Sequence, residues 1–438
     1  MSALDSRLAA IYILKRFRKQ KSWASETITS AQNRYNLDSR DTALAAALSK
    51  SVLEHQSLID FYLQLFSSIP MDKMESDVLE LLRIGAAQIL YMERIPDSAA
   101  VDTAVSGCRA LGRKKACGFV NAVLRNMIRE KNNLPEPDSS DPEENLSIRY
   151  SHPKWLVHRL VSRYGMEHTE AFMISNNENE SRTLYVNTLI ADAHQFESAL
   201  HEQGISFDSD PQRPDSVQIR QMGRVDKIPG YSDGLFYIQD PAAHEVSSVA
   251  GIEPNMSVLD CCAAPGGKTV SSSIRMKNTG SITACDIHEN KLHRITENCS
   301  RLQITNVECL AHDAREPLKG SFDVVLADVP CSGMGVIRKR PEIRYKREEE
   351  ILGLPQIQYD ILCNVSENVK PGGILVYSTC TVLKEENEDV VHRFLSDHSG
   401  FELVPFTTFG QSCDGMFTYW PQLHHTDGFF VCKMKKTN

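Results

Sequence analysis

The sequence predicts an α/β domain with a parallel sheet in its C-terminal part, preceded by an all-α domain and a small α/β subdomain. Three observations predict this order. Apolar residues recur at helical spacing through residues 1–132, and a segment rich in proline and acidic residues follows them. From about residue 250, short apolar runs alternate with helical stretches, as in a parallel sheet that helices cover on both faces.

The first part of the chain is predicted to be all-helical. Leu4, Leu8 and Ile11 fall on one face of a helix, and the same spacing returns twice further along. Ser76 or Asp77 is placed to cap the third helix. We therefore expect a compact helical bundle.

No membrane segment is predicted. The N-terminal stretch MSALDSRLAAIYILKRF carries charges within its apolar run, which argues against a signal peptide. No apolar run approaches the ~20 residues that a membrane helix needs. We expect a cytoplasmic monomer that makes no membrane contact.

A linker and a small subdomain are expected next. The segment NNLPEPDSSDPEENL holds three prolines and several acids, which indicates a linker over residues 133–147. Residues 148–240 combine two helical stretches with two strand-like runs, TLYVNTL and LFYIQD. Pro153 and Gly165 stand where the first of these helices begins and ends. We expect a small α/β (RRM-like) subdomain here, and the last domain over residues 241–438.

Charge is distributed unevenly along the chain. The net charge is −9, but residues 1–134 hold 19 basic against 14 acidic residues, a net +5, which leaves −14 for the remainder. A basic patch can still bind phosphate inside an acidic chain, because charges are screened beyond roughly 10 Å at physiological salt. Composition therefore neither indicates nor excludes a nucleic acid as partner.

The cysteines do not indicate a metal site. Twelve are present, yet none forms a CxxC pair, and no paired Cys and His spacing typical of zinc occurs. We expect reduced thiols, most of them acting as small buried hydrophobic residues, and no bound metal.

The first apolar run of the last domain leads into a glycine-containing loop. Residues 258–269 read VLDCCAAPGGKT, so small residues and two glycines follow a buried strand and open a helix. Such a backbone can approach a ligand closely. The spacing fits neither GxGxxG nor a P-loop, and a pyrophosphate cofactor is therefore not indicated. For this loop alone, a plain tight turn remains the alternative.

Four successive strands of this domain end in or near an acid: Asp260, Asp286, Asp313 and Asp328. Asp286 lies 20 residues after Gly266, where a carboxylate accepts hydrogen bonds from ribose hydroxyls. A single such aspartate is usually a helix cap. Four at one sheet edge favour a nucleoside ligand without phosphates. S-adenosylmethionine fits, with Asp313 at the adenine edge.

Two cysteines follow strands at the same predicted edge, Cys331 in DVPCSG and Cys380 in STC. Cytosine C5 is too electron-poor to attack a methyl sulfonium, but addition of a thiolate to C6 makes C5 nucleophilic. The reaction also needs an acid near the base N3 and a base that removes the C5 proton. Because a free thiol has a pKa of about 8.5, the site must stabilise the thiolate. One such cysteine alone is more often a buried, inert thiol.

These motifs resemble a known family. VLDCCAAPGGKT, ACD, DVPCSGMGVIRKRPEIRY and LVYSTCTVLKEENEDVV are similar to the motifs of the RsmB/Sun (Fmu) family of rRNA cytosine-C5 methyltransferases. The resemblance implies a Rossmann-like domain that transfers a methyl group from S-adenosylmethionine to C5 of a cytosine in 16S rRNA. It implies that Cys380 attacks C6, that Cys331 assists product release, and that Asp328 also contacts the target base. Lys268 is implied to belong to the same active site.

The resemblance also implies a set of cofactor-binding residues. They are Cys262, Ala263, Ala264, Pro265, Gly266, Gly267, Lys268, Asp286, Asp313 and Asp328. Three small departures from the family pattern, at Cys261, Val329 and Tyr345, remove no reacting group.

The resemblance extends over nearly the whole chain. LLRIGAAQILYMERIP, AVDTAVSGCRALG and GFVNAVLRNMIR are similar to a NusB-like RNA-binding domain. SHPKWLVHRL and SRTLYVNT resemble the small subdomain that the family places before its catalytic core, and HTDGFFVCKMKK resembles its closing strand.

Two basic clusters are candidates for RNA contacts. Arg338, Lys339, Arg340 and Arg344 follow the PCSG motif, beside the predicted cysteines, which favours contacts with phosphate over a merely solvated loop. Arg113, Lys114 and Lys115 form a second cluster in the helical domain.

Two other functions stay open at this point. A non-catalytic NusB-like ribosome-assembly or transcription factor would have no reason to keep both Cys331 and Cys380. A small-molecule methyltransferase would not need an RNA-binding domain or the basic cluster.

Overall fold

The computed structural model describes residues 3–20, 25–178, 181–211, 213–220 and 223–437. The chain divides into two compact units, Met1–Asn177 with Arg340–Glu348, and Glu178–Lys339 with Glu349–Asn438. Within the described residues, no helix combines the length and apolar character needed to cross a membrane.

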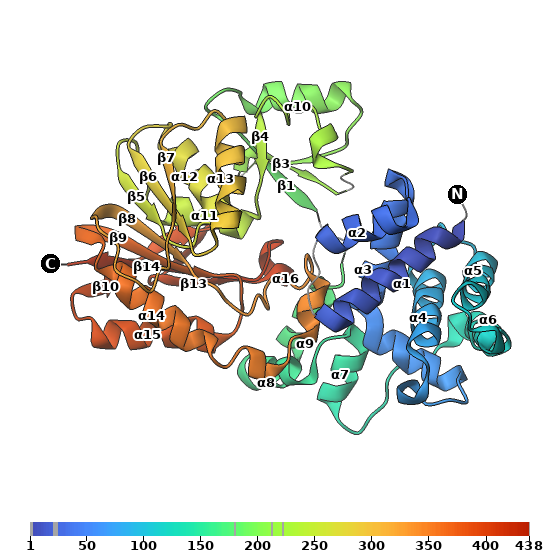
Figure 1. Ribbon diagram of the computed structural model, residues 1–438. Helices are drawn as coiled ribbons and strands as arrows, with labels where there is room; N and C mark the ends of the chain where they lie inside the picture. The colour runs from blue at the N-terminus through green and yellow to red at the C-terminus, as the bar shows by residue number, and fades with distance from the viewer. Residues whose placement is uncertain (1–2, 21–24, 179–180, 212, 221–222, 438) are drawn as a thin grey trace. The chain divides into compact units, whose positions relative to one another are not determined.

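The first unit opens with the predicted helical bundle (Figure 1). Its helices are α1 (Ala3–Gln20), α2 (Ser25–Tyr35), α3 (Ser39–Phe66), α4 (Ser76–Tyr91), α5 (Asp97–Ala110) and α6 (Cys117–Glu130). The apolar faces meet in one core, where Leu14, Leu48, Leu82 and Leu124 are fully buried. Burial of this shared face, more than helix propensity, holds such helices together.

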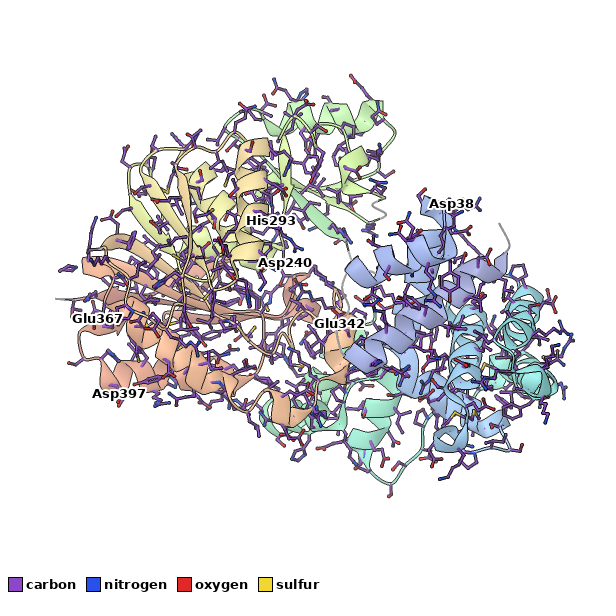
Figure 2. All side chains as sticks on the ribbon, in the orientation of Figure 1. Asp38, Asp240, His293, Glu342, Glu367 and Asp397 are labelled. Carbon is purple, nitrogen blue, oxygen red and sulfur yellow. The ribbon has the colours of Figure 1, made fainter. Side chains whose placement is uncertain are left out.

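The predicted cap of α4 is wrong. Glu75 occupies the N-cap position and makes no side-chain cap bond, whereas Asp38, which Figure 2 labels, caps α3. Asp77 instead accepts hydrogen bonds from Lys15 Nζ at 2.5 Å and from Arg113 Nη2 at 2.9 Å. The Asp77 carboxylate therefore binds two cationic side chains and does not cap the backbone of α4, as the local pattern had predicted.

Three further helices belong to the same unit: α7 (Pro142–Tyr150), α8 (Lys154–Tyr164) and α9 (Met166–Ser175). The predicted linker is thus partly helical. Its Asp141 side chain accepts from the amides of Glu143 and Glu144, and Pro142 has the fixed φ that suits a first helical position. The first unit reaches Asn177, so α8 and α9 belong to it and not to the second unit.

The nine residues Arg340–Glu348 also belong to the first unit. Arg344 is 4% exposed, and its guanidinium donates to carbonyl oxygens of Tyr150, Ser151 and Asn176. It donates as well to Glu54 O and to Asn177 Oδ1. These acceptors lie beside the kink of α3 and after or at the ends of α7 and α9, where helix carbonyls lack intrahelical partners.

The second unit starts with a small antiparallel sheet of order β2-β3-β1-β4. Its strands are β1 (Arg182–Val186), β2 (Asp208–Asp210), β3 (Arg213–Ile219) and β4 (Phe236–Ile238), and α10 (Ala193–Glu202) follows β1. Phe196 and Leu200 of α10 pack on Leu184, Val217 and Phe236 of the sheet. This confirms the small α/β subdomain.

A larger sheet forms the rest of this unit, in the order β10-β14-β9-β8-β5-β6-β7, with β13 paired to β14. Strands β9, β8, β5, β6 and β7 run parallel, whereas β14 is antiparallel to β9. The strands are β5 (Ser257–Asp260), β6 (Ser281–Asp286), β7 (Val307–Ala311), β8 (Phe322–Asp328), β9 (Val369–Thr379), β10 (Phe401–Leu403), β13 (Met416–Tyr419) and β14 (Phe429–Lys436).

Helices cover both faces of this sheet (Figure 1). On one side lie α14 (Leu354–Ser366) and α15 (Glu388–Asp397), and on the other α11 (Pro241–Val249), α12 (Gly267–Arg275) and α13 (Glu289–Arg301). Alternate strand residues serve the two cores: Leu259 and Leu375 pack toward α14 and α15, while Val258 and Val376 pack toward α11. The predicted parallel α/β domain is confirmed.

Candidate active site

The parallel register brings the predicted strand ends to one edge of the sheet. Asp260, the last residue of β5, lies opposite Ala284 of β6 and Leu326 of β8. At the end of β8, Asp328 lies opposite Ser378 of β9. Residues that are far apart in the sequence therefore meet at the carboxyl edge, where ligands of such sheets bind.

The loop after β5 is held against β6 by its own backbone. The amide of Ala263 donates to Cys285 O at 2.7 Å, and the amide of Gly266 donates to Ala263 O at 2.7 Å. Gly266 has a φ of +103°, and a Cβ there would lie 3.1 Å from the Ile295 side chain. A side chain at this position would be strained and crowded, which accounts for the glycine.

Two of the four strand-end acids support this loop. Asp260 is fully buried and accepts from Thr269 Oγ1 at 2.7 Å, and burial raises its pKa to about 6. Asp286 accepts from the amide of Ala264 at 3.3 Å and from that of His288 at 2.9 Å. The carboxylate of Asp286 thus lies directly beside the loop.

Asp313 lies just beyond β7, in an ion pair with Arg315 of 2.6 Å. Hydrogen bonds from Arg315 lower the pKa of Asp313 to about 2, so this carboxylate is charged at neutral pH. Its predicted contact with an adenine edge stays a prediction.

The two predicted cysteines lie side by side and are both partly exposed. Cys331 Sγ and Cys380 Sγ are 3.2 Å apart. A hydrogen bond from Cys331 lowers the pKa of Cys380, although burial acts against it. The same hydrogen bond, together with burial, raises the pKa of Cys331 well above its ordinary value. Cys380 is therefore the thiol that more readily becomes a thiolate.

An ion pair between the buried Lys268 and the half-buried Asp328 adjoins the thiols. Lys268 Nζ donates to Asp328 Oδ2 at 2.6 Å, and Ser378 Oγ donates to Asp328 Oδ1 at 2.9 Å. Burial would lower the pKa of Lys268, but the Asp328 carboxylate outweighs it and raises that pKa. The ammonium charge also lowers the pKa of Cys380. Lys268 therefore stabilises both a carboxylate and a thiolate.

Further polar contacts join the two cysteine loops. Ser332 Oγ and Thr381 Oγ1 are 2.8 Å apart, and Glu386 Oε2 accepts from the amide of Ser332 at 2.8 Å. Gln358 Nε2 donates to the same oxygen at 2.8 Å. Sequence reasoning assigned no role to these residues, although Ser332, Thr381 and Glu386 lie within the motifs around the two cysteines.

The basic residues after the PCSG motif are not a single surface cluster. Lys339 Nζ pairs with Asp240 Oδ2 and Asp427 Oδ2, each at 2.8 Å, and Arg344 lies inside the first unit. Arg338 donates to Thr426 O at 3.3 Å, whereas Arg340 is exposed. Acceptors of the protein itself engage Lys339 and Arg344, and the predicted contacts of these residues with phosphate stay a prediction.

Family models match three parts of the chain. Residues 4–129 match the NusB family, residues 152–226 the ferredoxin-like domain of RsmF/B-like methyltransferases, and residues 249–435 the 16S rRNA methyltransferase RsmB/F family. A protein of Bacillus subtilis (strain 168), named probable ribosomal RNA small subunit methyltransferase B, is 33% identical to this chain. The alignment is 454 residues long and covers 100% of both chains. This chain belongs to the RsmB/Sun family.

Other RsmB/Sun relatives and solved structures agree. Ribosomal RNA small subunit methyltransferase B of Proteus mirabilis (strain HI4320) is 32% identical, over 92% of each chain. A methyltransferase homolog protein from Pyrococcus horikoshii matches 68% of this chain and 100% of its own, at 28% identity and a TM-score of 0.60. NSun6 from Pyrococcus horikoshii, solved with SFG, is 22% identical over 65% of this chain and 98% of its own, with a TM-score of 0.61, and shows the shared fold.

Proposed function

We propose that the protein transfers a methyl group from S-adenosylmethionine to C5 of a cytosine in 16S rRNA. Membership of the RsmB/Sun family supports rRNA methylation. The observation that carries the choice of cytosine C5 is the pair of thiols, 3.2 Å apart at the same edge as the glycine loop. Methylation at C5 of a pyrimidine needs a covalent nucleophile of this kind, whereas methylation at nitrogen or oxygen does not.

The residues at the edge fit a nucleoside cofactor. Asp286 would accept from ribose hydroxyls, and Ile287, which is 55% exposed, offers an apolar face for adenine. The backbone of residues 262–267 would lie along the remainder, with Lys268 and Asp328 at its end, while Asp313 would reach the adenine edge. When bound, S-adenosylmethionine supplies an electrophilic methyl group.

The thiol chemistry follows from the geometry of the pair. The Cys380 thiolate forms a bond to C6 of the target cytosine, and the C5–C6 electron pair becomes available at C5. Asp328, 2.6 Å from Lys268 Nζ, would face the polar edge of the base near N3. After methylation, a base takes the C5 proton, and the electron pair left at C5 re-forms the C5–C6 double bond and expels the Cys380 thiolate from C6, which releases the product. Cys331, 3.2 Å from the Cys380 sulfur, is in reach of this step.

The target base must be outside a helix before a thiol can reach C6. Of the basic run after PCSG, Arg340 has an exposed side chain and is our strongest candidate for a phosphate contact there. The second cluster, Arg113, Lys114 and Lys115, is the other candidate, although Arg113 also pairs with Asp77 at 2.9 Å.

Cysteine variants test the proposal. With 16S rRNA and S-adenosylmethionine, the unchanged protein should produce 5-methylcytosine that bisulfite sequencing locates. Cys380→Ala should abolish the product, and Cys331→Ala should accumulate a covalent protein–RNA adduct. Cys363→Ala, which alters a half-buried thiol of α14, is the matched control and should retain activity. Normal turnover in Cys380→Ala, or turnover without adduct in Cys331→Ala, would contradict the assigned roles.

A further inference from the structure

A buried ion cluster lies within the second unit, made of Asp240, Lys339 and Asp427. Lys339 Nζ donates to Asp240 Oδ2 and to Asp427 Oδ2, each at 2.8 Å. The side chains of the two aspartates are 9% and 7% exposed, and that of Lys339 is 27% exposed. The ammonium is thus engaged by two carboxylates away from solvent.

Asp240 ties this cluster to the backbone. Located between β4 and α11 (Figure 2), it caps α11 by accepting from the amide of Ala242 at 3.0 Å. Its second oxygen, Oδ2, accepts from the amide of Asp427 at 3.0 Å. Lys339 and the Asp427 amide therefore share one carboxylate, which fixes the chain at the residue just before Gly428.

The next backbone contacts lead to the nucleophile. The amide of Gly428 donates to Gly335 O at 2.8 Å, and the amide of Gly335 donates to Cys380 O at 3.0 Å. The two glycines cross so closely that a Cβ on Gly335 would lie 1.8 Å from Gly428 O. Such a crossing does not adapt to small shifts, because interiors are close-packed. A displacement of Asp427 would be passed to the Cys380 backbone.

The same segment also borders the Lys268–Asp328 pair. Phe429, two residues after Asp427, begins β14, and its ring centre lies 5.1 Å from Lys268 Nζ. The residue after it, Phe430, pairs with Thr379, the neighbour of Cys380. The first residues of β14 therefore contact Lys268 on one side and pair with the strand end before Cys380 on the other.

We propose that Lys339, through Asp240 and Asp427, is a positioning residue that holds the Gly335–Gly428 crossing and thereby sets the places of Cys380 and Lys268. The inference rests on the proposed function. Without the ammonium, two buried carboxylates would repel each other, and one would have to move or take up a proton. Burial by itself would raise the pKa of Asp240, but Lys339 outweighs it and that pKa is lowered, whereas burial and the charge of Asp240 raise the pKa of Asp427 to about 7.

Substitutions at the cluster test this inference. Lys339→Met should lower kcat roughly 10- to 100-fold, the size expected when a reacting group is misplaced by about 1 Å. The KM values for S-adenosylmethionine and RNA should stay within about twofold. If Lys339→Met fails to fold, Asp427→Asn is the second variant. It keeps the shape of the side chain and should lower kcat in the same way. In the double variant, the loss should not exceed that of the worse single variant, because both changes break one network.

Lys370→Met is the matched control. Lys370 Nζ pairs with Asp323 Oδ1 at 2.8 Å and donates to Ser257 Oγ at 3.1 Å, which ties β9, β8 and β5 at the opposite edge of the sheet. Like Lys339→Met, the Lys370→Met variant loses a lysine–aspartate pair, so the melting temperature of this variant should fall while its kcat stays unchanged.

Three results would overturn the inference while leaving the proposed function intact. The first is an unchanged kcat in both single variants. The second is an equal loss of kcat in Lys370→Met. The third is a raised KM for RNA with a smaller salt dependence, which would mean that Lys339 contacts phosphate. If the unchanged protein itself forms no 5-methylcytosine, the proposed function has failed instead.

Discussion

Replacement of Arg344 should destabilise the first unit and should not act chiefly through RNA. Burial lowers the pKa of Arg344 to about 10, so the guanidinium remains charged at neutral pH. It donates to five acceptors from three parts of the unit, around Glu54, Tyr150 and Asn176. Arg344→Met would remove this donor from all five acceptors, of which Tyr150 O still accepts from His152 and Asn177.

The expected loss can be bounded. A hydrogen bond from a charged donor contributes about 1.5–3 kcal/mol, but contributions within one network do not add. Burial of the charge also costs several kcal/mol, which offsets part of the gain. We therefore expect Arg344→Met to lower the free energy of unfolding by about 3–5 kcal/mol, because several acceptors lose this donor and a buried polar group without a partner costs about 1–3 kcal/mol. Arg344→Lys should lose about 2 kcal/mol or more, because one ammonium cannot span acceptors on three segments.

Urea unfolding at pH 7, followed by circular dichroism, measures the loss. Hydrogen exchange of the amides in α7 and α9 assigns it to the segments that Arg344 joins. Arg340→Met, four residues away at an exposed position, is the control: it should leave stability unchanged while weakening RNA binding and its salt dependence. A loss below about 1 kcal/mol in Arg344→Met, or full stability in Arg344→Lys, would refute the reasoning.

Two further predictions concern titrating groups. At pH 7, iodoacetamide should modify Cys380 before Cys331, because the hydrogen bond from Cys331 lowers the pKa of Cys380. Cys331→Ala should slow that modification, and faster labelling in this variant would contradict the explanation. Burial raises the pKa of Asp260 from 3.8 to about 6, so its contribution to stability is present below about pH 4 and lost as the pH rises through 6. Asp260→Asn should remove roughly 3 kcal/mol of this pH dependence and increase stability at pH 7; an unchanged slope between pH 4 and 6 would argue against it.

The parallel core of the second unit was predictable from the sequence because its strands are buried on both faces. Runs such as FDVVLAD and GGILVYSTC are then apolar throughout, and the acid or cysteine at each end stands out. The carboxyl-edge position of Asp328 and Cys380 follows from parallel pairing alone. How far apart the two thiols lie does not follow, since it depends on loops whose course the strands do not fix.

Other parts could not be predicted from local pattern. Strands β2 and β3 read DSD and RPDSVQI, which are polar runs that become strands only by pairing, β3 with β1 and β2 with β3. Lys339 and Arg344 looked alike in one basic run, yet each is held by partners distant in the chain, Asp240 at a separation of 99 residues and Glu54 at 290. Propensity and spacing do not report such long-range partners.

The route of the chain has a consequence for dissecting the protein. The polypeptide passes from the first unit to the second at residue 177, returns at 340 and leaves again after 348. A fragment that begins after residue 177 would contain Arg344 and Tyr345 but not the carbonyl groups that they bind. In that fragment, the guanidinium and the aromatic ring would be exposed to water. The two fragments should therefore be co-expressed, because neither one by itself contains all the contacts of the first unit.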